Sequence, residues 1–149
     1  MKEIITKFSG EYHFLSNFYP CKIIVGINKK RIFPSVEHLY QASKTKDKDR
    51  QEGIRIAPNA SIAKQSGRLV PLREDWEEIK EQVMENAVLA KFLQNEDLQK
   101  KLIDTKPFFL VEGNHWHDNF WGDCYCRICK EIYGRNKLGK ILMDIRNRL

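Results

Sequence analysis

The strongest constraint on the fold of this chain is one long amphipathic segment, residues 74–94. Its apolar side chains recur every three or four positions, at Trp76, Ile79, Val83, Ala87 and Ala90. That spacing places them on one face of an α-helix. Acidic residues at positions 74, 75, 77 and 78 lie at the expected first turn, where the helix dipole favours negative charge. The segment predicts the longest helix of the chain, with a core packed against one of its faces.

Local signals predict five more helices. Their expected ranges are residues 35–44, 48–56, 59–67, 96–103 and 136–149. Ser35, Asn59 and Asn136 are expected to act as N-caps, because their side-chain oxygens can accept hydrogen bonds from the first turn of a helix. Gly67 is a suitable stop for the third of these segments. Helices should therefore dominate the fold.

The strand signals are short and lie mainly in the first third of the chain. Residues 3–8, 22–28 and 30–33 carry β-branched side chains, and residues 108–112 form a short apolar run. Residues 14–20 are aromatic and end in proline, so we expect an irregular segment on the surface of a core. No linker or repeat interrupts the sequence. We predict one α+β domain over residues 1–149, predominantly helical with a small N-terminal β element.

The composition limits the partners and the location of the protein. The formal net charge of +6 favours anionic partners, while the scatter of the basic residues is typical of a solvated surface. No apolar run approaches the roughly 20 residues that a membrane span needs. The N-terminus has no signal-peptide pattern. We expect a cytoplasmic protein that binds no membrane; its oligomeric state is not predicted.

Residues 35–44 carry the first candidate for chemistry. On a helix, Glu37, Gln41 and Lys44 stand at positions i, i+4 and i+7, so they project from one face. Glu37 lies in the first turn, where the helix dipole favours its ionised form. This suits a base, or a carboxylate that stabilises positive charge, better than a proton donor. The alternative is an ordinary helix stabilised by a first-turn Glu and a Glu–Lys face.

Two further segments resemble parts of a ligand site. Residues 115–123 gather two His, three Asp or Asn and two Trp beside a glycine, which fits a pocket or a polar loop whose aromatics plug the core. Residues 134–139 place Arg135 and Lys137 at a glycine-containing turn that leads into a helix. Such a turn can cradle an anion, although a plain capped helix also explains it.

Three cysteines form a tight Cys-x-Cys-x-x-Cys run at Cys124, Cys126 and Cys129. With His115 or His117 as a fourth ligand, they could hold a structural zinc ion. The first pair is closer than the usual Cys-x-x-Cys pair, and no second pair follows. A metal is therefore the alternative and not the favoured interpretation, and we expect no cofactor.

Together these segments resemble the NADAR (YbiA-like) family. The motifs that carry the resemblance occur in the family's order: residues 14–20, 35–44, 75–76, 91–92, 121–123 and 134–139. Members of that family hydrolyse N-glycosidic bonds, some in early ribosylamino intermediates of riboflavin synthesis and others in ADP-ribose attached to guanine. The resemblance implies the NADAR fold and the same class of hydrolase. This chain departs from larger members after Trp121-Gly122, where residues 124–129 replace a glycine-rich stretch.

The resemblance also implies a pocket built from Asn17, Glu37, Trp76, Trp121 and Asp123. In that hypothesis Glu37 stabilises an oxocarbenium-like transition state or activates water, and Lys44 is the second catalytic candidate, through a Schiff base with the opened sugar. Asp123 or Asp118 would hold ribose hydroxyls, and the two tryptophans would sandwich the base. Candidates for contacts with phosphate and with the rest of the substrate are Gln41, Lys64, Arg68, Arg135 and Asn136.

The substrate implied is a phosphorylated ribosyl small molecule, or an ADP-ribosylated guanine nucleotide or DNA. Two alternatives without catalysis remain at this point. One is a module that binds ADP-ribose, and the other is a nucleic-acid-binding protein suggested by the charge of +6. The latter predicts an affinity that falls steeply with salt.

Overall fold

The structure is a computed structural model that describes residues 3–149, and its internal contacts divide the chain into two compact units. One, the terminal unit, joins the N-terminal residues up to Ser16 with Asp97–Leu149. The other, the central unit, is Asn17–Glu96. The organisation as a single domain stays a prediction.

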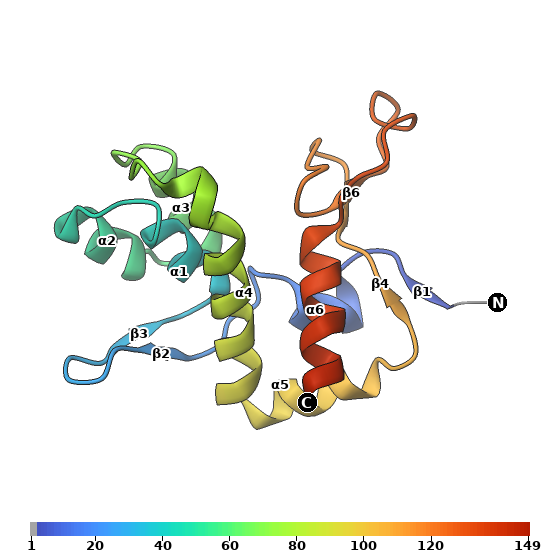
Figure 1. The fold of residues 1–149 in the computed structure, drawn as a ribbon, viewed down its shortest axis with the longest axis horizontal. Helices are drawn as coiled ribbons and strands as arrows, with labels where there is room; N and C mark the ends of the chain where they lie inside the picture. Colours follow the sequence, from blue (N-terminus) through green and yellow to red (C-terminus); the bar gives the residue numbers. More distant parts are fainter. Residues whose placement is uncertain (1–2) are drawn as a thin grey trace. The chain divides into compact units, whose positions relative to one another are not determined.

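The central unit contains one β-hairpin and four helices. The hairpin pairs β2 (Ile23–Val25) with β3 (Arg31–Phe33), and the helices are α1 (Val36–Ala42), α2 (Lys48–Arg55), α3 (Ala60–Gly67) and α4 (Trp76–Gln94). In Figure 1, α1, α2 and α3 gather near the start of α4, and the hairpin lies beside its later turns. The amide of Gln94 accepts from the N–H of Ile24 at 2.7 Å and donates to its carbonyl at 3.1 Å, which ties α4 to β2.

Two of the predicted helix caps are confirmed. The hydroxyl of Ser35 accepts from the N–H of His38 at 3.1 Å, and the side chain of Asn59 accepts from the N–H of Ile62 at 2.9 Å. The start of α2 has a cap that the sequence reasoning missed, since the side chain of Asp47 accepts from two N–H groups of the first turn. Local capping therefore fixes where these three short helices begin.

The buried face of α4 differs in part from the predicted stripe. Trp76 and Ala87 are buried as expected, but Ile79, Val83 and Ala90 are only half-buried. The other buried residues of this helix are Met84, Val88, Lys91 and Phe92. The predicted and the observed buried residues both recur with the period of a helix. The choice between them depends on the neighbouring elements that the helix packs against, which periodicity alone does not specify.

The terminal unit contains short strands between helices. Its elements are β1 (Ile4–Ile5), a 3-10 helix η1 (Gly10–Leu15), α5 (Glu96–Asp104), β4 (Phe109–Leu110), β5 (Gly113–Asn114), β6 (Asp123–Cys124) and α6 (Lys137–Arg148). β1 pairs with β4 and β5 with β6, both in parallel. α6 packs beside β4. The expectation of an irregular surface segment from residue 14 was wrong at its start, because Phe14 and Leu15 end the 3-10 helix and are buried.

A buried arginine ties α6 to the segment before β4. Arg146 is 6% exposed, and one nitrogen of its guanidinium donates to the hydroxyl of Thr105 at 3.0 Å and to the carbonyl of Phe108 at 2.8 Å. A buried charge needs such partners, because water no longer solvates it.

Across the described residues the fold comprises six α-helices and three two-stranded sheets, so the prediction of a helix-dominated α+β fold is confirmed. Between residues 3 and 149, no helix combines the length and the apolar character needed to cross a membrane.

Candidate functional site

The predicted polar face is present in the central unit for Glu37 and Gln41, but α1 ends at Ala42, so the expected helical position of Lys44 was wrong. Glu37 and Gln41 are 6% and 3% exposed, and the amide nitrogen of Gln41 donates to Glu37 Oε1 at 2.7 Å. The N–H of Glu37 donates to the carbonyl of Asn17 at 3.0 Å. The side-chain amide of Asn17 points elsewhere, toward the sulfur of Met84 at 3.3 Å. A carboxylate is thus held in a fixed place inside the unit, by one turn of helix and one neighbouring segment.

Lys44 interacts electrostatically with this carboxylate and with two other cations. Burial lowers the pKa of Lys44, the negative charge of Glu37 opposes that effect, and the charges of Lys64 and Arg68 lower it further. Lys64 lies in α3 and Arg68 directly follows that helix. The charge of Lys44 therefore interacts with two basic residues of α3 and its end, which the spacing within residues 35–44 did not indicate. Such a cluster attracts an anionic group.

Aromatic rings surround the same part of α1. The rings of Tyr40 and Trp76 pack with centroids 5.2 Å apart, and the ammonium of Lys44 lies 5.7 Å from the centroid of Tyr40. Trp76 is only 4% exposed, so most of its ring packs in the core beside Tyr40. Phe18 is 36% exposed, and the ammonium of Lys64 lies over its ring at 5.8 Å. Phe18 is thus more accessible than Tyr40 or Trp76, and the sequence analysis did not single it out although its motif was noted.

In the terminal unit, Asp118 shapes the loop that carries Trp121. Its carboxylate accepts from the N–H of Phe120 at 3.1 Å and from the N–H of Trp121 at 2.9 Å. This is a local turn made by an aspartate side chain. Asp123 accepts from the N–H of Gly134 at 3.1 Å, and the ring of Trp121 meets Phe120 edge-on at 4.8 Å. Of the two candidate acids, Asp118 has the clearer structural role.

Asn136 does not cap α6 in the predicted way. It stands at the N-cap position with a left-handed backbone (φ 49°), and its side chain makes no capping bond. The side chain instead accepts from the N–H of Glu112 at 3.0 Å and donates to the carbonyl of Leu110 at 2.9 Å. The sequence suggested a local cap, whereas the partners lie more than twenty positions away. The predicted role of this side chain as an N-cap was wrong.

The start of α6 also offers less to an anion than predicted. The N–H of Lys137 donates to the carbonyl of Phe120 at 3.2 Å, and the N–H of Leu138 donates to the carbonyl of Trp121 at 2.9 Å. Two donors of the first turn are therefore already used. Arg135 is exposed with its guanidinium over the ring of Phe120 at 5.7 Å, so it remains a side chain that a phosphate could reach.

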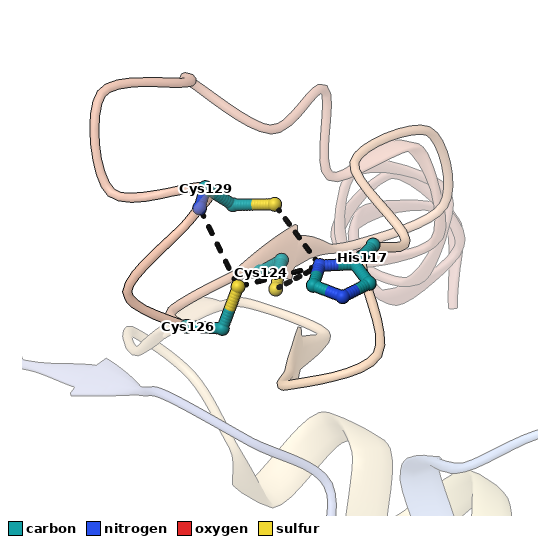
Figure 2. A group of neighbouring side chains, drawn as sticks. All are labelled: His117, Cys124, Cys126 and Cys129. Carbon is teal, nitrogen blue, oxygen red and sulfur yellow. Dashed lines mark hydrogen bonds between the residues drawn. The ribbon is translucent and has the colours of Figure 1, made fainter.

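The cysteine run converges with one histidine. His117, Cys124, Cys126 and Cys129 place one ligand atom each so that all four lie within 4.8 Å of one another (Figure 2). His115 is not in this group. It is exposed and packs against the rings of its neighbour Trp116 and of Tyr125. Of the two histidines considered as a fourth ligand, the structure selects His117.

Comparison with known proteins places this chain in a family. The sequence model of the NADAR domain matches residues 6–149. The chain belongs to the NADAR family. The N-glycosidase YbiA of Escherichia coli K12 is 36% identical over an alignment that covers 100% of this chain and 91% of YbiA. The solved NMR structure of E. coli YbiA superposes with a TM-score of 0.84, at 37% identity, covering 99% of this chain and 86% of that one.

Two other NADAR relatives extend the comparison. An N-glycosidase of Nostoc punctiforme is 38% identical and covers 93% of this chain and 86% of its own length. A riboflavin biosynthesis protein of Vibrio vulnificus is 41% identical over 91% of this chain, which corresponds to 35% of that protein. The prediction of the family is confirmed, and so is the prediction of an N-glycosidase at the level of that family.

Proposed function

We propose that this NADAR protein hydrolyses the C1–N bond of a phosphate-bearing ribosyl compound, with Glu37 as the catalytic carboxylate. The observation that carries the proposal is the buried contact between Glu37 and Gln41. The charge of Lys44 interacts with that of Glu37 and with those of Lys64 and Arg68. The amide of Gln41 orients this carboxylate, and the cations around Lys44 can meet a phosphate. The N-glycosidase relatives support the reaction class.

In the proposed reaction the C1–N bond breaks as positive charge develops on the sugar ring. The Glu37 carboxylate stabilises that charge and takes a proton from the water that attacks C1. That proton then passes to the departing nitrogen, so one water supplies the hydroxyl of C1 and the hydrogen of the released amine. Gln41 fixes the orientation of the carboxylate through its 2.7 Å hydrogen bond. A preorganised carboxylate need not rearrange during the reaction, which is why its burial favours catalysis.

Lys44 supports a second route through the same site. Burial lowers its pKa, so its amine can lose the proton more readily than an exposed lysine. The neutral amine could then form an imine with the opened ribose aldehyde, releasing water. Borohydride added to the working enzyme would trap that imine on Lys44. Absence of an adduct assigns the reaction to the water route.

The substrate class that we favour is a ribosylamino-pyrimidine phosphate. A NADAR relative in Vibrio vulnificus carries the name riboflavin biosynthesis protein. The local cluster of three cations suits one phosphate group. ADP-ribosylated guanine is the alternative, and the two substrates should be assayed side by side. The roles of Trp121 toward the base and of Asp123 toward the ribose hydroxyls stay predictions.

The central test is the substitution Glu37→Gln, which keeps the shape of the side chain and removes its charge. We expect the turnover number to fall by about a hundredfold to ten-thousandfold, the usual range for a positioned acid–base group. The matched control is Glu78→Gln on α4, an exposed glutamate, which should keep full turnover.

Circular dichroism and thermal unfolding of both variants separate loss of chemistry from loss of fold. Normal turnover by a folded Glu37→Gln variant, on a substrate that the parent protein cleaves, would refute the assignment. No cleavage of either substrate by the parent protein would refute the substrate class.

A further inference from the structure

One group of side chains in the terminal unit has no part in the proposed reaction. The imidazole of His117 and the thiols of Cys124, Cys126 and Cys129 point toward a common centre (Figure 2). Nδ1 of the histidine lies 3.3 Å from the sulfur of Cys126, 3.4 Å from that of Cys129 and 4.0 Å from that of Cys124. Three sulfurs thus surround one ring nitrogen.

These distances match a tetrahedral metal site. With Zn–S bonds near 2.3 Å and Zn–N bonds near 2.0–2.1 Å, tetrahedral geometry puts the nitrogen about 3.6 Å from each sulfur. The three measured distances, 3.3, 3.4 and 4.0 Å, bracket that value. Hydrogen bonding alone explains the arrangement poorly, because Nδ1 can carry one hydrogen and so can donate to one sulfur at a time.

The backbone around the group supports the same interpretation. His117 has a left-handed backbone, with φ of 70°, which is unfavourable for a residue with a Cβ atom. The same residue has its ring among the cysteine sulfurs. The N–H of Cys129 points at the sulfur of Cys126 at 3.4 Å. Hydrogen bonds of this kind to a ligand atom are a common second layer around bound metals.

The loop that holds the cysteines has little core of its own. Tyr125, Ile128 and Tyr133 are 60%, 80% and 99% exposed, so burial of apolar side chains contributes little to its order. In contrast, two of the cysteines are buried, since Cys124 and Cys129 are only 2% and 4% exposed. A cross-link among the thiols would hold together a segment that hydrophobic packing does not.

We propose that His117, Cys124, Cys126 and Cys129 bind one Zn²⁺ in a closed structural site. Thiolate and imidazole ligands select zinc over the hard cations, and four protein ligands leave no open position for substrate. The ion stabilises the loop after β6, and through Cys124 it fixes the neighbouring Asp123. This zinc proposal does not depend on the proposed catalytic role of Glu37.

The test is metal analysis of the full-length protein, expressed in zinc-supplemented medium and purified without chelator. We expect close to one zinc per chain by mass spectrometry of the metal content. Cys126→Ser and His117→Ala should lose most of that zinc. Two matched controls should keep it: Cys21→Ser, which removes a thiol of the central unit, and His115→Ala, which removes the neighbouring imidazole outside the group.

A second measurement does not depend on the folding of any variant. Cobalt added to the metal-free parent protein should give the visible bands of tetrahedral Co²⁺ and the thiolate-to-cobalt charge-transfer band, and zinc should abolish both. Zinc well below one per chain together with absence of the cobalt spectrum would overturn the proposal. So would iron with inorganic sulfide in place of zinc.

Discussion

At the scale of single residues, His38 combines burial with two satisfied ring nitrogens. Nε2 donates to the carbonyl of Ala57 at 3.0 Å, so Nδ1 accepts from the hydroxyl of Ser35 at 2.6 Å in the neutral ring. Burial lowers the pKa of His38, and the hydrogen bond to Ala57 only partly opposes this. A protonated ring would lose its acceptor toward Ser35 and would carry a charge inside the unit. His38 therefore helps to position α1 as a neutral group.

The protein should consequently lose stability as the pH falls below the ordinary histidine value of about 6.5. The unfolded chain binds a proton there while folded His38 does not, so unfolding becomes easier until the pH reaches the lowered folded pKa. One such proton changes the free energy of unfolding by at most about 1.4 kcal/mol per pH unit. Urea unfolding between pH 8 and pH 5 measures this slope, for the parent and for His38→Gln.

His38→Gln keeps a donor and an acceptor but does not titrate, so its slope in this window should be shallower. His13→Gln is the matched control, because it removes an exposed histidine of η1 instead of a buried one. Equal slopes for the parent and His38→Gln would show that other groups cause the acid sensitivity.

At the scale of elements, the close approach of α1 and α3 depends on Gly67. A Cβ atom at this position would lie 2.0 Å from Oε1 of Gln41 and 3.0 Å from its Cβ. Gln41 is 3% exposed and bonds Glu37, so it cannot move aside without changing that carboxylate. The packing of two helices thus controls the geometry of the candidate catalytic group.

We expect Gly67→Ala to reduce turnover by about tenfold or more, by displacing Gln41 and with it the orienting bond to Glu37. The overpacking should cost roughly 1–3 kcal/mol of stability, partly offset by the better helix propensity of alanine, about 1 kcal/mol. Steady-state kinetics and urea unfolding check both effects.

Gly53→Ala is the matched control, because Gly53 lies in α2 and a Cβ atom at that position would meet no other atom within 4 Å. It should keep activity and gain up to about 1 kcal/mol of stability. Full activity of Gly67→Ala would mean that the contact between α1 and α3 does not set the position of Glu37.

The elements also indicate what the sequence could and could not predict. Ser35 and Asn59 cap their helices as predicted, since a cap involves partners only a few positions away. Asn136 also stands where an N-cap is expected, yet its side chain forms hydrogen bonds with Leu110 and Glu112, which are distant in sequence. Contacts of that range arise from the fold as a whole, and local spacing does not encode them.

The candidate sites also contain some contacts that are local in sequence and others that depend on the whole fold. Glu37 and Gln41 were predicted to share a face because both lie on one helix, and their hydrogen bond confirms it. The approach of Lys64 and Arg68 to Lys44 depends on how α3 packs on α1, so no single segment could predict it. The sequence left His115 and His117 open as partners of the cysteines, and only the folded loop shows that His117 lies among them.

At the scale of the whole molecule, the net charge of +6 acts on every anionic ligand, whereas the cluster of Lys44, Lys64 and Arg68 acts locally. The two contributions respond differently to salt. Diffuse attraction is screened over a Debye length of about 10 Å at 0.1 M salt, while close contacts with phosphate persist better. A polymer would displace many counterions, with a slope of about 0.7 per contacted phosphate for single strands. A small phosphorylated substrate should give a far shallower dependence.

We therefore expect kcat/KM for a ribosylamino-pyrimidine phosphate to fall only about two- to tenfold between ~50 and ~500 mM KCl. Arg68→Gln should lower kcat/KM at low salt and flatten this dependence, because it removes a cation of the local cluster. Lys100→Gln, which removes an exposed charge of α5, should leave both nearly unchanged. Initial rates over the salt series measure each slope. Equal effects of the two substitutions would mean that net charge alone attracts the substrate, and the local cluster would then have no role in binding its phosphate.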